Sequence, residues 1–242
     1  MDRRGRLYIT GVMLVLTVGG LTYLSNIYGG NFDADGVFYL RSSFIKLTYD
    51  HIFLVATSSS LATLFGVFCG IFVTRRAGRE FLPVVNMLAS VGQTFPPVAV
   101  LALAVPLVGF GAKPTIIALL FYGIFPIVRN TIAGIESVPA EIKEAARGVG
   151  MYDLEILFKV ELPMAASIIM AGVRTSVIIN IGTATIGATI GAGGFGAPIV
   201  SGLINENFYY VLQGGVCVAL LAVFTDQLLL AAVSKLSSFK AA

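Results

Sequence analysis

Residues 134–163 read GIESVPAEIKEAARGVGMYDLEILFKVELP, the longest polar stretch in an otherwise apolar chain of 242 residues. Six acidic and three basic side chains fall within it. Charges at this density are too costly to place in the hydrocarbon of a bilayer. We therefore expect the stretch to project from a membrane, between two segments that cross it.

The same residues predict a helical elbow. Pro139 suits the first turn of a helix, where its missing N–H costs nothing, and the residues up to Arg147 are mostly strong helix formers. This first helix should stop at one of the two glycines that follow, and a second helix should run over residues 152–161. Because Pro163 lacks a donor and discourages helical geometry in the residue before it, we expect the second helix to turn there.

The composition predicts a membrane protein. Hydrophobic residues make up 57% of the chain and charged residues 12%, with a mean hydropathy of +0.89, whereas soluble domains average about 25% charged residues. At about 20 residues per span there is room for roughly six helices and no sizeable soluble domain. The net charge of +3 is spread between the spans, which argues against a nucleic-acid partner.

The apolar segments place the spans. The third is interrupted by Gln93-Thr94-Phe95-Pro96-Pro97, and a double proline should make it discontinuous. A signal peptide is the alternative for the first segment, which is longer than a typical signal core and lacks an obvious cleavage site. The expected spans cover residues 7–24, 51–73, 82–110, 114–132, 165–190 and 209–233.

The chain divides into residues 1–46, a first span with a polar outer segment, and residues 47–242, a core that includes the loop 134–163. Within the outer segment, residues 38–49 are expected to form an amphipathic helix at the membrane interface, because their aromatic side chains suit that boundary. With six spans, twelve of the sixteen Lys and Arg residues lie on the side of the termini and the elbow. The positive-inside rule places that side in the cytoplasm.

Two features within the spans predict contacts between helices. Gly66 and Gly70, four residues apart in the second span, should let another helix approach closely. Arg174 and Asp226 are the ionisable residues deepest in the fifth and sixth spans, at similar depths. They form an ion pair, or else Arg174 extends to the cytoplasmic interface while Asp226 meets water or backbone donors.

Polar and glycine residues mark a candidate pathway or gate. Gly191, Gly193, Gly194 and Gly196 spell the dinucleotide-binding pattern GxGxxG, but a membrane span precedes them instead of a strand, so nucleotide binding is not expected. Two uses stay open for these glycines, a flexible outer gate and tight packing. Gln93, at the break of the third span, is a candidate for a polar pathway or gate. Asn180 in the fifth span either lines such a pathway or holds helices together.

The sequence predicts no metal site and no catalytic group. No Cys/His cluster has metal-ligand spacing, and no nucleophile stands at motif distance from a base. Cys69 and Cys217 lie in apolar runs, where they act as small hydrophobic residues. His51, at a span boundary, is interpreted as a structural residue.

The elbow also carries a sequence signature. It contains Glu-Ala-Ala, then Gly after three residues, and an aliphatic residue, one residue and Leu-Pro after nine more. The residues that fill it are Glu144, Ala145, Ala146, Gly150, Val160, Leu162 and Pro163. This pattern resembles the cytoplasmic loop of permease subunits of bacterial ABC importers, the binding-protein-dependent transport inner-membrane component family, with Val160 where Ile is usual.

The resemblance implies an all-α membrane protein with the ABC importer permease (MetI-like) fold, in the bacterial cytoplasmic membrane. It implies that the residues of the signature couple the spans to a separate ATPase, which would hold ATP and magnesium. This chain would carry no cofactor of its own. Further implied partners are a second permease copy, identical or not, and an extracytoplasmic solute-binding protein.

A second resemblance extends from about Leu47 to the end of the sixth span. The pair Asp50-His51 and the run Ile190–Gly196 look like the osmoprotectant branch of these permeases, which carries glycine betaine, choline, carnitine or related solutes. The residues before Leu47 gain no support from it. The alternatives are a permease for another small solute such as an amino acid, a membrane assembly protein without transport, and a membrane-embedded enzyme.

Overall fold

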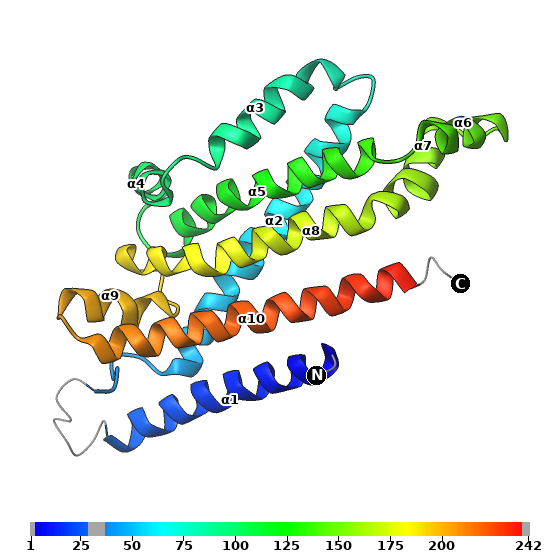
Figure 1. Ribbon diagram of the computed structural model, residues 1–242. Helices are drawn as coiled ribbons and strands as arrows, with labels where there is room; N and C mark the ends of the chain where they lie inside the picture. The colour runs from blue at the N-terminus through cyan, green and yellow to red at the C-terminus, as the bar shows by residue number, and fades with distance from the viewer. Residues whose placement is uncertain (1–2, 29–36, 239–242) are drawn as a thin grey trace.

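The chain is an all-α membrane protein, and its computed structural model (Figure 1) describes residues 3–28 and 37–238, with side chains over 5–28 and 37–233. Parts of the polar segment 25–50 and of the basic chain ends lie outside this description. The elements are α1 (Arg3–Tyr28), α2 (Phe44–Thr74), η1 (Arg79–Phe81), α3 (Leu82–Gly92), α4 (Pro97–Val108), α5 (Ala112–Glu136), α6 (Ala140–Gly148), α7 (Asp153–Ile156), the π-helix η2 (Leu157–Glu161), α8 (Leu162–Thr183), η3 (Ala184–Ile190), α9 (Gly196–Ile204) and α10 (Phe208–Ser238).

Within the described residues, five helical runs are long and apolar enough to cross a membrane, and the bent pair α3–α4 makes a sixth if it counts as one span. The helix direction bends by 102° between α3 and α4. After α3, Thr94 N–H turns back to the carbonyl of Val91. Pro97 then opens α4, in a first turn where its missing donor costs nothing. The predicted break in the third span is confirmed.

The pair α3–α4 connects opposite ends of the bundle. Before it, Arg75 at the end of α2 pairs with Glu161 at 2.7 Å. After it, Gly111 N–H donates to the carbonyl of Ile190 at 2.9 Å. Glu161 and Ile190 lie at the two ends of the helical run formed by α8 and η3. The chain therefore crosses the bundle between these contacts, and α3–α4 is a broken span rather than a re-entrant loop.

Close helix packing holds the centre of the bundle, where α2, α5 and α8 run side by side (Figure 1). A Cβ added at Gly70 of α2 would lie 2.6 Å from Thr131 Cβ of α5. A Cβ at Gly172 of α8 would lie 2.6 Å from Asn130 Cβ of α5. Gly66 is similarly restricted, at 2.9 Å from an α5 side chain. The predicted close approach at Gly66 and Gly70 is confirmed, because only glycine leaves room for it.

The predicted separate helix over residues 38–49 is wrong. The helix α2 begins only at Phe44 and continues without a break to Thr74. Ser43 caps it, with Oγ accepting a backbone N–H of the first turn at 3.3 Å. Ahead of this cap, Tyr39 N–H donates to Oε1 of Gln213 in α10 at 3.2 Å. These residues pair with a neighbouring helix instead of forming one of their own.

The predicted turn at Pro163 is also wrong, because α7, η2, α8 and η3 form one helical run from Asp153 to Ile190. The π-helix η2 removes the conflict that proline creates in an α-helix. Leu162 N–H donates to the carbonyl of Leu157, five residues back. A π turn widens the backbone and shifts the hydrogen-bond register, so Pro163 enters the first turn of α8 without breaking the run.

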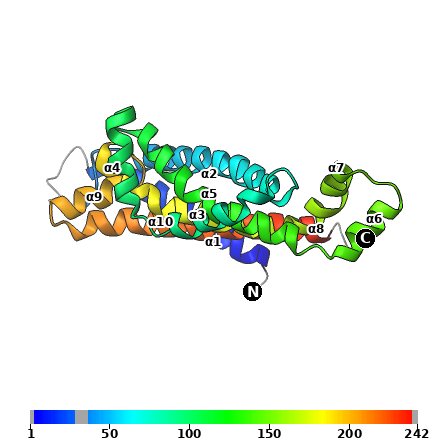
Figure 2. The ribbon, with the colours of Figure 1, turned by 90° about the horizontal axis from the view of Figure 1, so that it is seen from above.

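The last two predicted spans are confirmed as α8–η3 and α10, with a short helix, α9, between them that the sequence did not predict. The start of α1 and the end of α10 point toward the end of the bundle that carries α6 (Figure 1). Figure 2 shows that α6 and α7 project beyond that end. The elbow therefore projects to where another protein can reach it.

Candidate functional site

The elbow is built around a glycine turn. After α6, Gly150 adopts φ +88°, and its N–H donates to the carbonyl of Arg147 at 2.9 Å. Met151 N–H donates to the carbonyl of Ala146 at 3.1 Å. These two bonds form a Schellman motif, which needs a residue with positive φ at the position of Gly150. The backbone conformation of this turn thus explains why the signature has glycine at this position, independently of any partner protein.

The predicted coupling residues fall into two groups. Glu144 and Ala145 are exposed on α6, whereas Ala146 is only 8% exposed and faces its own chain. Leu162 and Pro163 are half-buried in the helical run. Only the first group lies where another protein could touch it, together with the exposed turn at Gly150.

Exposed apolar side chains on the elbow were missed in the sequence. Val149 is 78% exposed, Tyr152 80% and Leu154 69%. Large apolar groups on a segment that is polar and projects from the bundle indicate a surface that binds protein. The sequence could have indicated this surface, because these three residues are bulky and apolar within a polar stretch.

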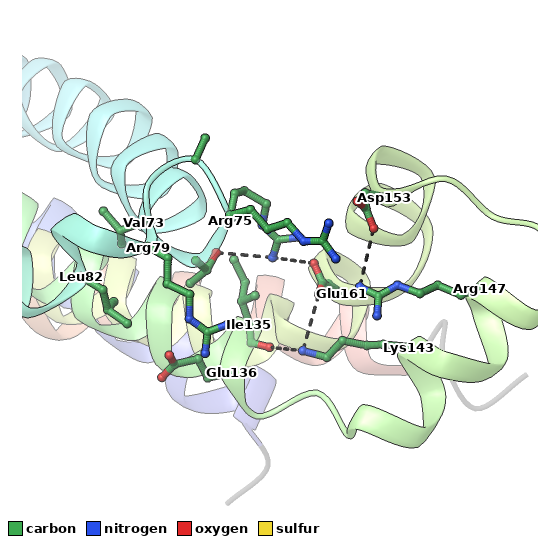
Figure 3. Close-up of a pocket in the computed structure, with 13 residues that line it drawn as sticks. Val73, Arg75, Arg79, Leu82, Ile135, Glu136, Lys143, Arg147, Asp153 and Glu161 are labelled. Atoms are coloured by element: carbon green, nitrogen blue, oxygen red, sulfur yellow. Dashed lines mark hydrogen bonds and ion pairs between the residues drawn. The ribbon is translucent and has the colours of Figure 1, made fainter.

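A charged cavity separates the elbow from the bundle. Its volume is about 670 Å³, and Figure 3 shows its lining from the end of α2, α5, α6 and η2. Five cationic and three anionic side chains line it, namely Arg75, Arg76, Arg79, Lys143, Arg147, Glu136, Asp153 and Glu161. The ion pairs that cross it join Arg75 and Lys143 to Glu161, and Arg147 to Asp153 at 3.6 Å. Of these pairs, Arg75–Glu161 links the elbow to the end of α2, whereas the other two lie within the elbow.

Arg174 and Asp226 form an ion pair. Nη2 of Arg174 donates to Oδ2 of Asp226 at 2.9 Å, and Nε lies 2.5 Å from Oδ1. The two contacts make a bidentate pair between α8 and α10, the arrangement in which a guanidinium binds a carboxylate most strongly. Of the two alternatives drawn from the sequence, the structure has the direct pair.

Asn180 and Gln93 are not brought together. Asn180 is fully buried, and its Nδ2 donates to Ser59 Oγ of α2 at 3.0 Å. It therefore joins α8 to α2 in this structure instead of lining an open path. Gln93 is exposed at the break between α3 and α4.

The glycine run forms a packed turn over His51. Gly191, Gly193 and Gly194 have φ of 81°, 79° and 71°. Phe195 N–H, next in the chain, donates to His51 Nδ1 at 3.3 Å. His51 Nε2 lies 3.0 Å from the carbonyl of Ile181. A carbonyl only accepts, so His51 is neutral with its proton on Nε2, and it ties the glycine turn to α8.

The Gly191–Gly196 turn does not have the surroundings of a nucleotide site. It follows the 3₁₀-helix η3 instead of a strand. A Cβ added at Gly196 would lie 2.1 Å from the carbonyl of Thr185, so this glycine is required for tight packing. Among the described residues, no group of three or more His, Cys, Asp or Glu is placed to hold a metal ion.

Comparison with known proteins gives a consistent set of relatives. The family model of the binding-protein-dependent transport system inner membrane component matches residues 62–238. An osmoprotectant import permease protein of Salmonella typhimurium is 42% identical over 179 residues, which cover 74% of this chain and 76% of the relative. A choline transport system permease protein of Bacillus subtilis is 41% identical over 192 residues, 78% of this chain and 87% of the relative.

The fold has solved counterparts. A chain of the MetNI methionine ABC transporter, in an inward-facing conformation, superposes with a TM-score of 0.70 at 20% identity. The match covers 78% of this chain and 93% of that chain. At this identity the likeness concerns the fold alone.

Proposed function

This chain belongs to the binding-protein-dependent transport system inner membrane component family, and on that premise we propose that it is the permease subunit of an ATP-driven importer for a small osmoprotectant. The substrate class rests on the names of the relatives, which are permeases for osmoprotectants and for choline. The solutes we assign are therefore glycine betaine, choline, carnitine or a related compound.

The observation that supports coupled transport best is the continuous helical run from Asp153 to Ile190. Its 38 residues span about 57 Å at 1.5 Å per residue, while the hydrocarbon of a bilayer is about 30 Å thick. One continuous helical element thus begins in the elbow and ends at the glycine turn held by His51. A displacement of the elbow reaches the opposite face as a tilt of this run.

The partners follow from the exposed surfaces. Val149, Tyr152 and Leu154, with Glu144 and Ala145 beside them, form the surface that we assign to an ATPase subunit, where ATP and magnesium would bind. Two permease subunits would surround the solute path. A solute-loaded binding protein would contact the opposite face, near residues 110–114 and 191–207.

The same assignment fixes the orientation. The elbow must lie in the cytoplasm to meet an ATPase, and the start of α1 and the end of α10 point to that side (Figure 1). Both termini are therefore assigned to the cytoplasm of a bacterial inner membrane, in agreement with the positive-inside rule. We assign no catalytic group to this chain.

The test is ATP turnover by the complex in proteoliposomes. The permease is purified with its ATPase, and the loaded binding protein is added with glycine betaine, choline, carnitine or methionine. The expected result is that the quaternary ammonium solutes stimulate turnover and are taken up, whereas methionine is not. Stimulation by methionine alone would overturn the substrate class, and failure of any ATPase to co-purify would overturn the transport role.

A further inference from the structure

Glu161 occupies the one position between the aliphatic residue and Leu-Pro that the signature leaves unspecified. It ends the π-helix η2, and π turns occur often at functional sites. Among the described side chains it is the only buried acidic one, with 4% of the residue exposed. A carboxylate this deep is costly unless it is paired.

Its two cationic partners come from different elements. Nη2 of Arg75, at the end of α2, lies 2.7 Å from Glu161 Oε2. Nζ of Lys143, in α6, lies 3.5 Å from Oε1 and 3.4 Å from the carbonyl of Ile135 at the end of α5. Figure 3 shows both cations directed at Glu161, Arg75 from the end of α2 and Lys143 from α6. The carboxylate thus joins α6 to the end of α2, and Lys143 joins α6 to the end of α5.

We propose that Glu161 is a positioning residue that holds α6 against the end of α2, so that motion of the elbow reaches α2 as well as α8. This inference rests on the proposed function, because it concerns how ATPase motion enters the bundle. If α6 moved while α2 stayed in place, the buried carboxylate would lose its contact with Lys143. The favourable motion carries Arg75 and Lys143 along together.

The exposure of the three side chains predicts that a substitution of Glu161 can impair coupling without impairing folding. The side chains of Arg75 and Lys143 are 29% and 23% exposed and border the cavity, whereas that of Glu161 is 5% exposed. When Glu161 is replaced by Gln, the cations still reach water, so the cost to folding is small. When Arg75 is replaced by Gln, a buried carboxylate loses its nearer partner. The acid is therefore the better residue to change.

The first experiment measures uptake and ATP turnover by the complex in proteoliposomes. Glu161→Gln is expected to keep the assembled complex while lowering uptake at least tenfold. Arg75→Gln added to Glu161→Gln should lower uptake by less than a further twofold, because residues that act through one contact are not additive. Glu155→Gln is the matched control, since it removes a carboxylate whose pair with Lys159 is on the exposed side of the same helical run.

The uptake data can overturn the proposal in two ways. Uptake by Glu161→Gln within twofold of wild type would do so. So would a double variant whose loss is the product of the two single losses, because Glu161 and Arg75 would then act independently. If Glu161→Gln does not insert, Lys143→Gln takes its place, and wild-type uptake in that variant overturns the proposal.

A distance measurement separates this proposal from the transport assignment. Spin labels at Ala77, in the turn after α2, and at Ala145, on α6, are both at exposed positions. In the full permease chain without other subunits, Glu161→Gln should broaden the distance distribution between them, whereas Glu155→Gln should not. An unchanged distribution overturns the role of Glu161. A broadened distribution in a chain that binds no ATPase would support it and refute only the proposed transport function.

Discussion

Replacing Gly70 by Ala should destabilise the contact between α2 and α5. The new Cβ would lie 2.6 Å from Thr131 Cβ and 2.7 Å from its Cγ2, well inside the carbon–carbon optimum of about 3.5–4.0 Å. The Cβ of Thr131 is bonded to the backbone of α5, so rotation of its side chain cannot relieve the contact. The two helices must move apart.

The magnitude follows from two opposing effects. Overpacking of this kind costs about 1–3 kcal/mol, and the better helix propensity of Ala returns about 0.8–1.0 kcal/mol. Because the clash involves an atom fixed to the backbone, we expect the upper part of the range, a net loss of about 1–2 kcal/mol. For a chain of this length, about 2–4 °C per kcal/mol converts this loss to a fall of roughly 2–8 °C in the thermal midpoint.

The assay is thermal unfolding of the purified permease in detergent, at one scan rate for all variants because such transitions are often irreversible. Gly19→Ala in α1 is the matched control, since no atom lies within 4 Å of its added Cβ. Its midpoint should equal or exceed that of wild type. Adding Thr131→Gly to Gly70→Ala moves the small residue to the other helix and should recover at least half of the loss.

Two results would refute this reasoning. A midpoint for Gly70→Ala at or above wild type would mean that α2 and α5 do not approach as closely as the structure has them. A fall of equal size in Gly19→Ala, which has no neighbour within 4 Å of its added Cβ, would mean that the loss does not come from the contact between α2 and α5.

Three further predictions concern the elbow and the membrane interior. Gly150→Ala should cost about 1–2 kcal/mol in the turn because of the positive φ at this position, and it should reduce solute-stimulated ATP turnover in an inserted chain. Gly148→Ala, with no atom within 4 Å of its added Cβ, should leave turnover unchanged, and equal effects of the two changes would contradict the role of the turn. Arg174→Ala and Asp226→Ala should each strand a charge at a cost of about 2.5–3.5 kcal/mol, and the double variant should melt above either one; additive losses would argue against the pair. A cysteine at Ala145 should react with an impermeant maleimide only in inside-out vesicles, and labelling of intact cells would exclude contact with a cytoplasmic ATPase.

Several structural outcomes depended on partners that the sequence does not identify. The segment just before α2 is not helical, and in it the backbone N–H of Tyr39 donates to Gln213 of α10. Asn180 bonds to Ser59 of α2, a contact between residues far apart in the chain. Arg174 and Asp226 were recognised as candidates from their matched depths, but only the packing of α8 against α10 brings them into contact.

The sequence by itself determined the number of spans, the break at Pro96-Pro97 and the polar elbow. These features depend on properties that a residue carries wherever it lies, such as the cost of charge in hydrocarbon and the missing donor of proline. The tertiary structure decided that Pro163 does not end the helix, because the π turn before it changes the backbone register. It also decided the place of Glu161, since α2, α5 and α6 meet there only after the chain has folded.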